Sequence, residues 1–195
     1  REVTLRYPDG STRTRTLEFS HHGPIIARQD GRAYAARIAY DEHADRNLAW
    51  EKLNFAKDYT GALAAGATQS LFPQNLMVAD TSGNIAYQRV GRVPRRNPAY
   101  DWSKPVPGDT AATAWQGFHE GSELLQLVNP AAGYLQNCNI PPEGMIRGKS
   151  LDPVKYPDYL WGSRAYGERS GWTNQRGARA LELLSADTSV TVAEA

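Results

Sequence analysis

Several features that are common in proteins are scarce in this chain of 195 residues. The single cysteine, Cys138, excludes an internal disulfide and a metal site built from several cysteines, and it leaves the redox compartment undecided. No apolar run is long enough to cross a bilayer, and no secretory signal precedes the first strand-like residues. The 22 basic and 21 acidic residues nearly cancel, so no broad electrostatic field indicates binding to nucleic acid or to a membrane surface. What remains is the composition of a globular protein long enough to bury a core.

The order of residue patterns predicts one partial domain over residues 1–195, made of five regions. Alternating apolar and polar residues, with Pro-Asp-Gly and Asp-Gly turns between them, predict a β meander over residues 1–44. Apolar residues at loosely helical spacing predict a helical segment over residues 45–66, with Asp45 as its N-cap and Gly66 as its stop.

The later regions mix strands with irregular segments. Residues 73–139 predict β structure interrupted by a long loop rich in proline and glycine, residues 140–172 are irregular, and residues 173–195 are helical. The hairpin over residues 78–91 could by itself belong to a β-propeller blade. The chain has no internal repeat, however, and a propeller needs several copies of such a unit.

The most informative stretch, residues 130–141 (PAAGYLQNCNIP), brings two asparagines to the end of a predicted strand. Asparagine is disfavoured inside strands, and its amide donates hydrogen bonds without carrying a charge. Such a donor can hold an oxyanion that exists only during a reaction. Asn137 and Asn139 can also simply tie down the turn into the following prolines. Cys138 between them can be a nucleophile or a small buried thiol, and no histidine is near it in the sequence.

The four histidines invite a metal or catalytic interpretation. We expect His21 and His22 to lie on a strand, where adjacent side chains point to opposite faces and cannot easily chelate one metal. We therefore interpret this pair as structural. His43 and His119 are isolated in the sequence, and we expect both at the surface.

Four segments in a particular order give the chain a family resemblance. They are residues 21–26 (HHGPII), 75–96 (NLMVADTSGNIAYQRVGRVPRR), 105–108 (PVPG) with Trp115-Gln116-Gly117 after them, and 129–139 (NPAAGYLQNCN), followed by a looser match at Arg176 and Arg179 ahead of Leu183-Leu184. Each segment alone is unspecific. Together they span most of the chain and resemble the β-chain of the penicillin amidase-type acylases, which include penicillin, aculeacin and acyl-homoserine-lactone acylases.

The resemblance implies an α+β fold, a four-layered αββα sandwich of antiparallel sheets with helices outside, and the chemistry of N-terminal nucleophile hydrolases. In these enzymes a precursor cleaves itself, and a serine becomes the first residue of the β-chain. That serine attacks an amide carbonyl while its own α-amine takes the proton. An α-amine titrates at roughly 7.7–8.0, close enough to neutral pH to act as a base. No cofactor is implied for the reaction.

Two residues acquire candidate catalytic roles from the resemblance. Asn139 matches the second asparagine of the strand-end motif, whose side chain is one of the oxyanion donors in the family. Arg176 matches an arginine that helps to order this asparagine and the polar end of the substrate, although a plain helix-surface arginine is the alternative. Asn137 is expected to fix the strand end.

A structural calcium is also possible, because some family members bind one through their proline-rich loops. Asp101, Asp152 and Asp158 are oxygen ligands in the corresponding regions. The chain has no EF-hand spacing, so further ligands would have to come from outside it.

The nucleophile of the family has no match, because residue 1 is Arg1 and nothing near it resembles a processed Ser, Thr or Cys. We therefore interpret the chain as an internal piece of a periplasmic or secreted acylase, inactive alone. Its expected partners are the remaining α- and β-chain segments and an acyl-amide substrate. Open sheet edges or apolar faces should result, either covered by another copy of the chain or left exposed. The alternative is a non-catalytic binding or scaffold domain with the same sandwich.

Overall fold

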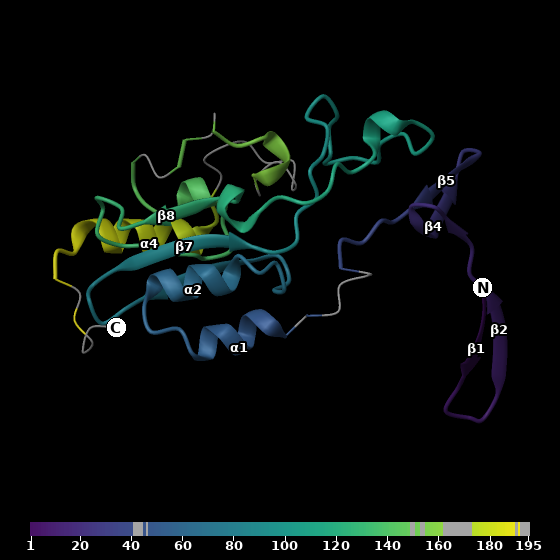
Figure 1. Ribbon diagram of the computed structural model, residues 1–195, viewed down its shortest axis with the longest axis horizontal. Helices are drawn as coiled ribbons and strands as arrows, with labels where there is room; N and C mark the ends of the chain where they lie inside the picture. Colours follow the sequence, from purple (N-terminus) through teal and green to yellow (C-terminus); the bar gives the residue numbers. More distant parts are fainter. Residues whose placement is uncertain are drawn as a thin grey trace.

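The computed structural model describes residues 1–40, 45, 47–148, 151–152, 155–161, 173–189 and 191. Figure 1 shows two parts, an extended arm that carries the N-terminal strands and a body that holds the helices and the central sheet. The proline-rich loop that follows β7 (Ile85–Val90) reaches from the body toward the arm (Figure 1).

The arm consists of two small antiparallel sheets. β1 (Glu2–Arg6) pairs with β2 (Thr12–Thr16), and a second sheet has the strand order β3 (Phe19–Ser20), β4 (Gly23–Gln29), β5 (Arg32–Ala35). The strands are antiparallel, as a meander requires, but the prediction of one continuous meander is wrong, because β2 and β3 belong to different sheets. The last strand ends at Ala35, so residues 36–40, which the predicted β region includes, are not in a strand.

The predicted helical segment over residues 45–66 is two helices, α1 (Leu48–Asn54) and α2 (Tyr59–Gly66). The break has a local cause. The Asp58 carboxylate accepts a hydrogen bond from the backbone N–H of Gly61 at 2.8 Å and so begins a new helix. Asn47, not Asp45, occupies the N-cap of α1, and Gly66 is the last residue of α2 instead of the residue after it.

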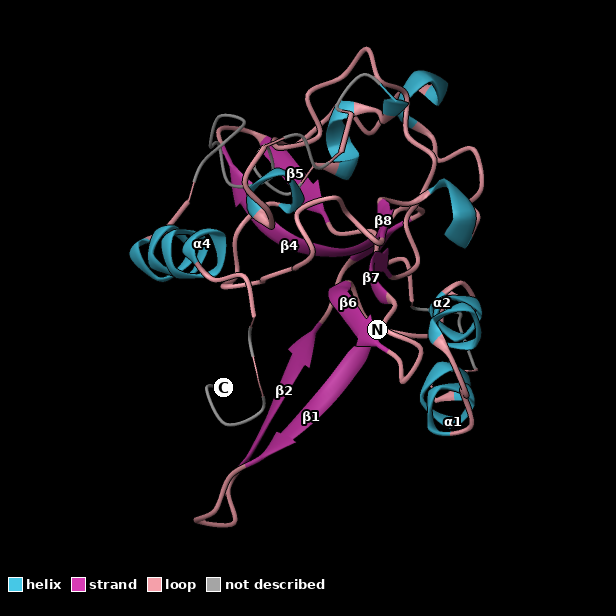
Figure 2. Ribbon diagram, turned by 90° about the vertical axis from the view of Figure 1, so that its left-hand side faces the viewer, coloured by secondary structure: helices cyan, strands magenta, loops and turns pink. Residues whose placement is uncertain are grey.

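The body is built on the antiparallel sheet β6 (Gln74–Ala79), β7, β8 (Gln126–Val128), with β7 in the centre. Residues on the two faces of β7 belong to two different apolar clusters. Tyr87 packs with Leu124, Leu125, Met145, Leu160 and Trp161, whereas Val90 packs with Ala49 and Leu71 beside the helices. Figure 2 shows α1 and α2 on one side of this sheet and α4 (Gln175–Ala186) on the other. Both faces of the central strand are therefore buried.

Two predicted elements of the C-terminal half are wrong in part. Residues 130–139 form a loop and not a strand, because the N–H of Gln136 donates to the carbonyl of Met145 at 3.1 Å and Asn139 adopts a left-handed φ of 58°. The final helix ends at Ala186, so residues 187–189 and 191 are not helical. Ala180, Leu181 and Leu184 lie on its less exposed side. The grouping of residues 1–195 into one partial domain stays a prediction.

None of the helices in the described part of the chain has the length and hydrophobicity needed to cross a membrane.

Candidate active site

The backbone of Asn139 is held by the side chain of Asn137, two residues earlier in the same loop. The side-chain oxygen of Asn137 accepts a hydrogen bond from the backbone N–H of Asn139 at 3.1 Å. This Asx turn supports the left-handed backbone of Asn139, a conformation that asparagine tolerates better than most residues. Asn137 thus fixes the end of the motif, the role the sequence suggested for it. The side chain of Asn139 itself is exposed.

The N-terminus of α4 packs against this loop. Asn174 is the N-cap, and its side-chain oxygen accepts from the N–H of Gly177 at 2.8 Å. Its amide nitrogen donates to the carbonyl of Cys138, also at 2.8 Å. Asn174 did not emerge as a site residue from the sequence. An asparagine directly before a helical pattern signals an N-cap, but nothing in the sequence shows that its amide reaches a loop 36 residues away.

The structure brings the two predicted site residues together. The Nη2 atom of Arg176 donates to Oδ1 of Asn139 at 3.0 Å and to the carbonyl of Cys138 at 3.3 Å. Because a guanidinium has no acceptor, it must face the amide oxygen. The Nδ2 group of Asn139 is left as the outward donor. The arrangement thus presents an uncharged N–H donor beside a positive charge, which suits a developing oxyanion.

The whole chain is similar to proteins of one known family. The penicillin amidase family matches over residues 1–195, the whole chain. The chain belongs to the penicillin amidase family. It is similar to the penicillin acylase 2 proenzyme of Pseudomonas sp. (strain SE83), with 26% identity over 154 residues that cover 77% of this chain and 19% of that protein.

A solved structure shows the same fold. The thermostable penicillin G acylase from Alcaligenes faecalis matches with a TM-score of 0.76 and 22% identity, over 100% of this chain and 32% of that one. This match confirms the predicted α+β class and the place of the chain in the N-terminal nucleophile hydrolase sandwich. The chain spans about a fifth of the length of the proenzyme and about a third of the matched chain of the solved structure.

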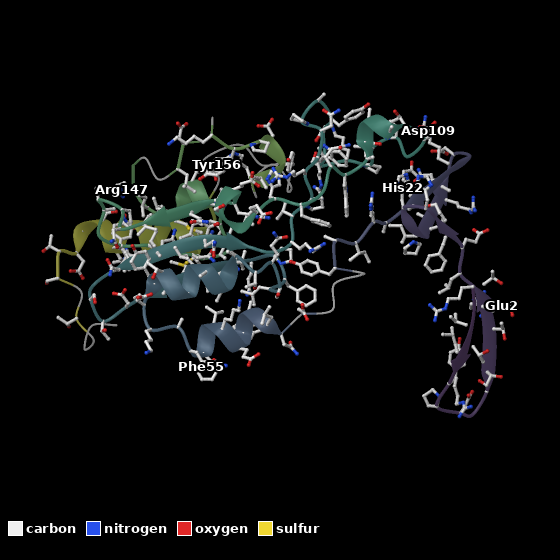
Figure 3. The ribbon with its side chains drawn as sticks, in the orientation of Figure 1. Glu2, His22, Phe55, Asp109, Arg147 and Tyr156 are labelled. Atoms are coloured by element: carbon white, nitrogen blue, oxygen red, sulfur yellow. The ribbon has the colours of Figure 1, made fainter. Side chains whose placement is uncertain are left out.

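The histidines of this penicillin amidase family member differ from expectation. His21 and His22 lie in the turn between β3 and β4, not on a strand, and their ring centroids are 3.8 Å apart. The Nε2 atom of His22 lies 2.7 Å from the carbonyl oxygen of Gly108, so this ring links the arm to the proline-rich loop. Figure 3 shows His22 beside the segment around Asp109. The structural interpretation of the pair therefore holds for His22, although its position was wrong. His43 lies outside the described residues.

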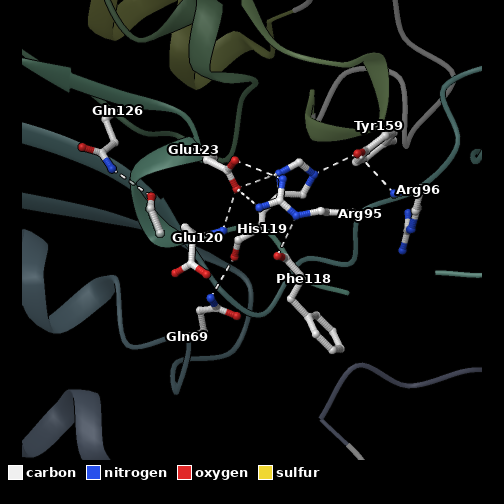
Figure 4. A network of polar contacts seen from close by, with 10 residues as sticks. Gln69, Arg95, Arg96, Phe118, His119, Glu120, Glu123, Gln126 and Tyr159 are labelled. Atoms are coloured by element: carbon white, nitrogen blue, oxygen red, sulfur yellow. Dashed lines mark hydrogen bonds and ion pairs between the residues drawn. The ribbon is translucent and has the colours of Figure 1, made fainter. Parts of the chain in front are cut away.

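His119 is buried, contrary to the prediction of a surface position. It is 7% exposed, and its Nε2 atom lies 2.8 Å from the hydroxyl of Tyr159 in η5 (Asp158–Leu160) (Figure 4). Its Nδ1 atom lies 3.4 Å from Oε2 of Glu123, which also pairs with Arg95 at 2.7 Å. Burial and the charge of Arg95 lower the pKa of His119, and Glu123 partly opposes them. This network joins two loops of the body and contains none of the predicted site residues.

The three aspartates considered for calcium do not form a cation site by themselves. Asp101 pairs with Lys104 at 2.9 Å, and hydrogen bonds from Ser103, then Lys104, lower its pKa to about 2. Asp101 and Asp158 line a cavity of about 270 Å³, but Arg96 lines it too, and its positive charge opposes a bound cation. No group of three His, Cys, Asp or Glu side chains among the described residues could hold a metal ion. Calcium stays a prediction that depends on ligands from elsewhere.

Proposed function

We propose that this chain is part of an acylase that hydrolyses linear amide bonds, and that the side chain of Asn139 donates a hydrogen bond to the oxyanion of the tetrahedral intermediate. The observation that carries the proposal is the contact between Arg176 and Asn139. It fixes the orientation of the amide, so that the N–H group and not the carbonyl faces outward. A donor that is already oriented costs no reorganisation when negative charge develops.

The nucleophilic serine, its α-amine and the second oxyanion donor come, in this proposal, from other segments of a longer protein. The lengths of the relatives support this, because the matched regions cover 19% of the proenzyme and 32% of the matched chain of the solved acylase. We expect residues 1–195 alone not to hydrolyse an acyl-p-nitroanilide, since a lone oxyanion donor has nothing to stabilise.

Exposed apolar residues in the arm and directly after α1 support the proposal that other segments of the protein pack against them. Ile26 and Phe55 are 68% and 78% exposed, and Leu5, Leu17 and Phe19 are also exposed. We propose that remaining α- and β-chain segments of the acylase cover these residues, with self-association of the chain as the competing explanation. We also propose that the full-length acylase is periplasmic or secreted, as its family resemblance implies.

The substrate class is an acyl amide, such as a penicillin, a lipopeptide or an acyl-homoserine lactone. Asn139 and Arg176 are polar and do not form the apolar pocket that would select the acyl group. A panel of acyl-p-nitroanilides with aryl and aliphatic chains of different lengths, tested on the full-length protein, identifies the acyl group.

The role of Asn139 is tested in the full-length protein by Asn139→Ala. Removal of one oxyanion donor typically costs about 10²–10³-fold in kcat, and we expect that loss with little change in KM, since the donor acts only in the transition state. Asn54→Ala is the matched control, because Asn54 is an exposed asparagine at the end of α1. A kcat for Asn139→Ala within about twofold of the wild type contradicts the proposal. Absence of amide hydrolysis by the unmodified full-length protein favours the non-catalytic scaffold instead.

A further inference from the structure

The peptide unit between Cys138 and Asn139 is held at both of its polar atoms by asparagine side chains. Its carbonyl accepts from Nδ2 of Asn174 at 2.8 Å, and its N–H donates to Oδ1 of Asn137 at 3.1 Å. The plane of this peptide sets the φ of Asn139, which is 58°. A left-handed conformation in a residue other than glycine persists only where its surroundings impose it.

Asn174 also determines where Arg176 stands. As the N-cap it begins α4, and Arg176 follows on the first turn. The helix approaches the loop closely at Gly177, where an added Cβ would lie 2.9 Å from Cγ2 of Ile140. The two contacts of Arg176, with the carbonyl of Cys138 and the amide of Asn139, therefore depend on the same junction.

We propose that Asn174 is a positioning residue that orients Asn139 for catalysis by clamping the Cys138 carbonyl. This inference rests on the proposed function of Asn139 as the oxyanion donor. Without the clamp only the longer contact from Arg176, at 3.3 Å, holds the Cys138 carbonyl, so the peptide between residues 138 and 139 can rotate and relieve the left-handed backbone. The amide of Asn139 then leaves the position in which Arg176 holds it, and a displacement of about 1 Å can cost about 10²-fold in rate.

The decisive variant is Asn174→Ser in the full-length protein. Serine caps a helix about as well as asparagine, so α4 still begins at the same residue, but serine is too short to reach the Cys138 carbonyl. We expect kcat to fall by about 10- to 100-fold, with KM and the thermal unfolding midpoint nearly unchanged. Asn174→Asp, which keeps the cap and loses the donor, serves as a second variant if the serine protein folds poorly.

A double-mutant cycle with Asn139→Ala separates the inference from the function on which it rests. If Asn174 acts through Asn139, then Asn174→Ser lowers kcat in the wild type but not further in the Asn139→Ala background. If the two substitutions lower kcat by independent factors that multiply in the double mutant, Asn174 does not act through Asn139. A wild-type kcat in Asn174→Ser also overturns the positioning role, and in both cases the function of Asn139 stands. An Asn139→Ala enzyme with wild-type kcat refutes the proposed function itself.

Discussion

At the scale of single residues, the buried imidazole of His119 couples stability to pH. Its ring contacts Tyr159 and lies beside Glu123 and Arg95, and burial together with the charge of Arg95 lowers its pKa from the ordinary value of about 6.5. The unfolded chain therefore binds a proton in a pH range where the folded chain does not. Protons favour the unfolded state in that range, so the stability contributed by the neutral ring is present above about pH 6.5 and is lost as the pH falls through the folded pKa.

We accordingly expect the urea midpoint of unfolding to fall between pH 7.5 and pH 5.5, and His119→Gln to flatten this dependence by removing the titrating group. His21→Gln, at an exposed histidine, is the control and should keep the wild-type slope. The carboxylate of Glu123 has its own pKa lowered, first by the hydrogen bond from Arg95, so its effect on stability appears at lower pH. If the urea midpoint of His119→Gln depends on pH as steeply as that of the wild type, His119 is not the group that couples stability to pH.

At the scale of elements, α2 rests on the sheet through a glycine. A Cβ on Gly66 would lie 2.2 Å from Oε1 of Gln88 and 2.8 Å from Cγ1 of Val90, both on β7 and both buried. The helix can approach the strand this closely only because the side chain is absent. Gly66 was predicted as a helix stop, and the structure gives it a packing role instead.

Substitution of Gly66 by alanine should therefore destabilise the protein, although alanine is the better helix former. Overpacking costs about 1–3 kcal/mol, against a propensity gain of about 1 kcal/mol. Gly61→Ala in the same helix is the matched control, because its Cβ would have its nearest neighbours at an ordinary 3.5 Å, and we expect it to be neutral or stabilising. Thermal unfolding midpoints of the two variants distinguish these outcomes, and equal midpoints would contradict the packing argument.

At the scale of the whole molecule, the arm and the body differ in charge and in burial. Residues 1–40 contain seven arginines and four acidic residues, a formal charge of +3 in a chain of net charge +1, so the other residues carry −2. In the hairpin, the register pairs Val3 with Arg15 and Leu5 with Arg13, which places them on one face, while the paired Thr4 and Thr14 lie on the other. A two-stranded hairpin whose strands are almost entirely exposed, as they are here, is marginal in water.

If partner segments cover the face that holds Leu5, a charge placed there should be costly. We expect Leu5→Asp in the full-length protein to lower the thermal unfolding midpoint, because burial of a leucine contributes about 1.5–3 kcal/mol and a carboxylate cannot replace it. Thr4→Asp, one residue earlier and on the opposite face, should be close to neutral. Equal midpoints for the two variants would mean that this face of the hairpin stays exposed to solvent.

The local patterns of the sequence were enough for much of this architecture. The β6–β7 hairpin followed from strand-like residues on both sides of the Ser82-Gly83-Asn84 turn, and the final helix from the apolar spacing of Ala180, Leu181 and Leu184. The combination of four segments placed the chain in its family. The hairpin and the helix depend on neighbours within a few residues, which is why the sequence specifies them.

Contacts across the fold decided the rest. The break before α2 depended on whether the Asp58 cap would outweigh a continuous apolar pattern, and the burial of His119 depended on Tyr159, 40 residues away. The candidate site is the clearest case. Asn137, Asn139 and Arg176 could be named from the sequence, but the orientation of the Asn139 amide comes from Arg176, 37 residues further on, and the clamp on its peptide comes from Asn174. The sequence determines which residue types the site contains. The direction in which the Asn139 amide donates is determined only when distant segments pack together.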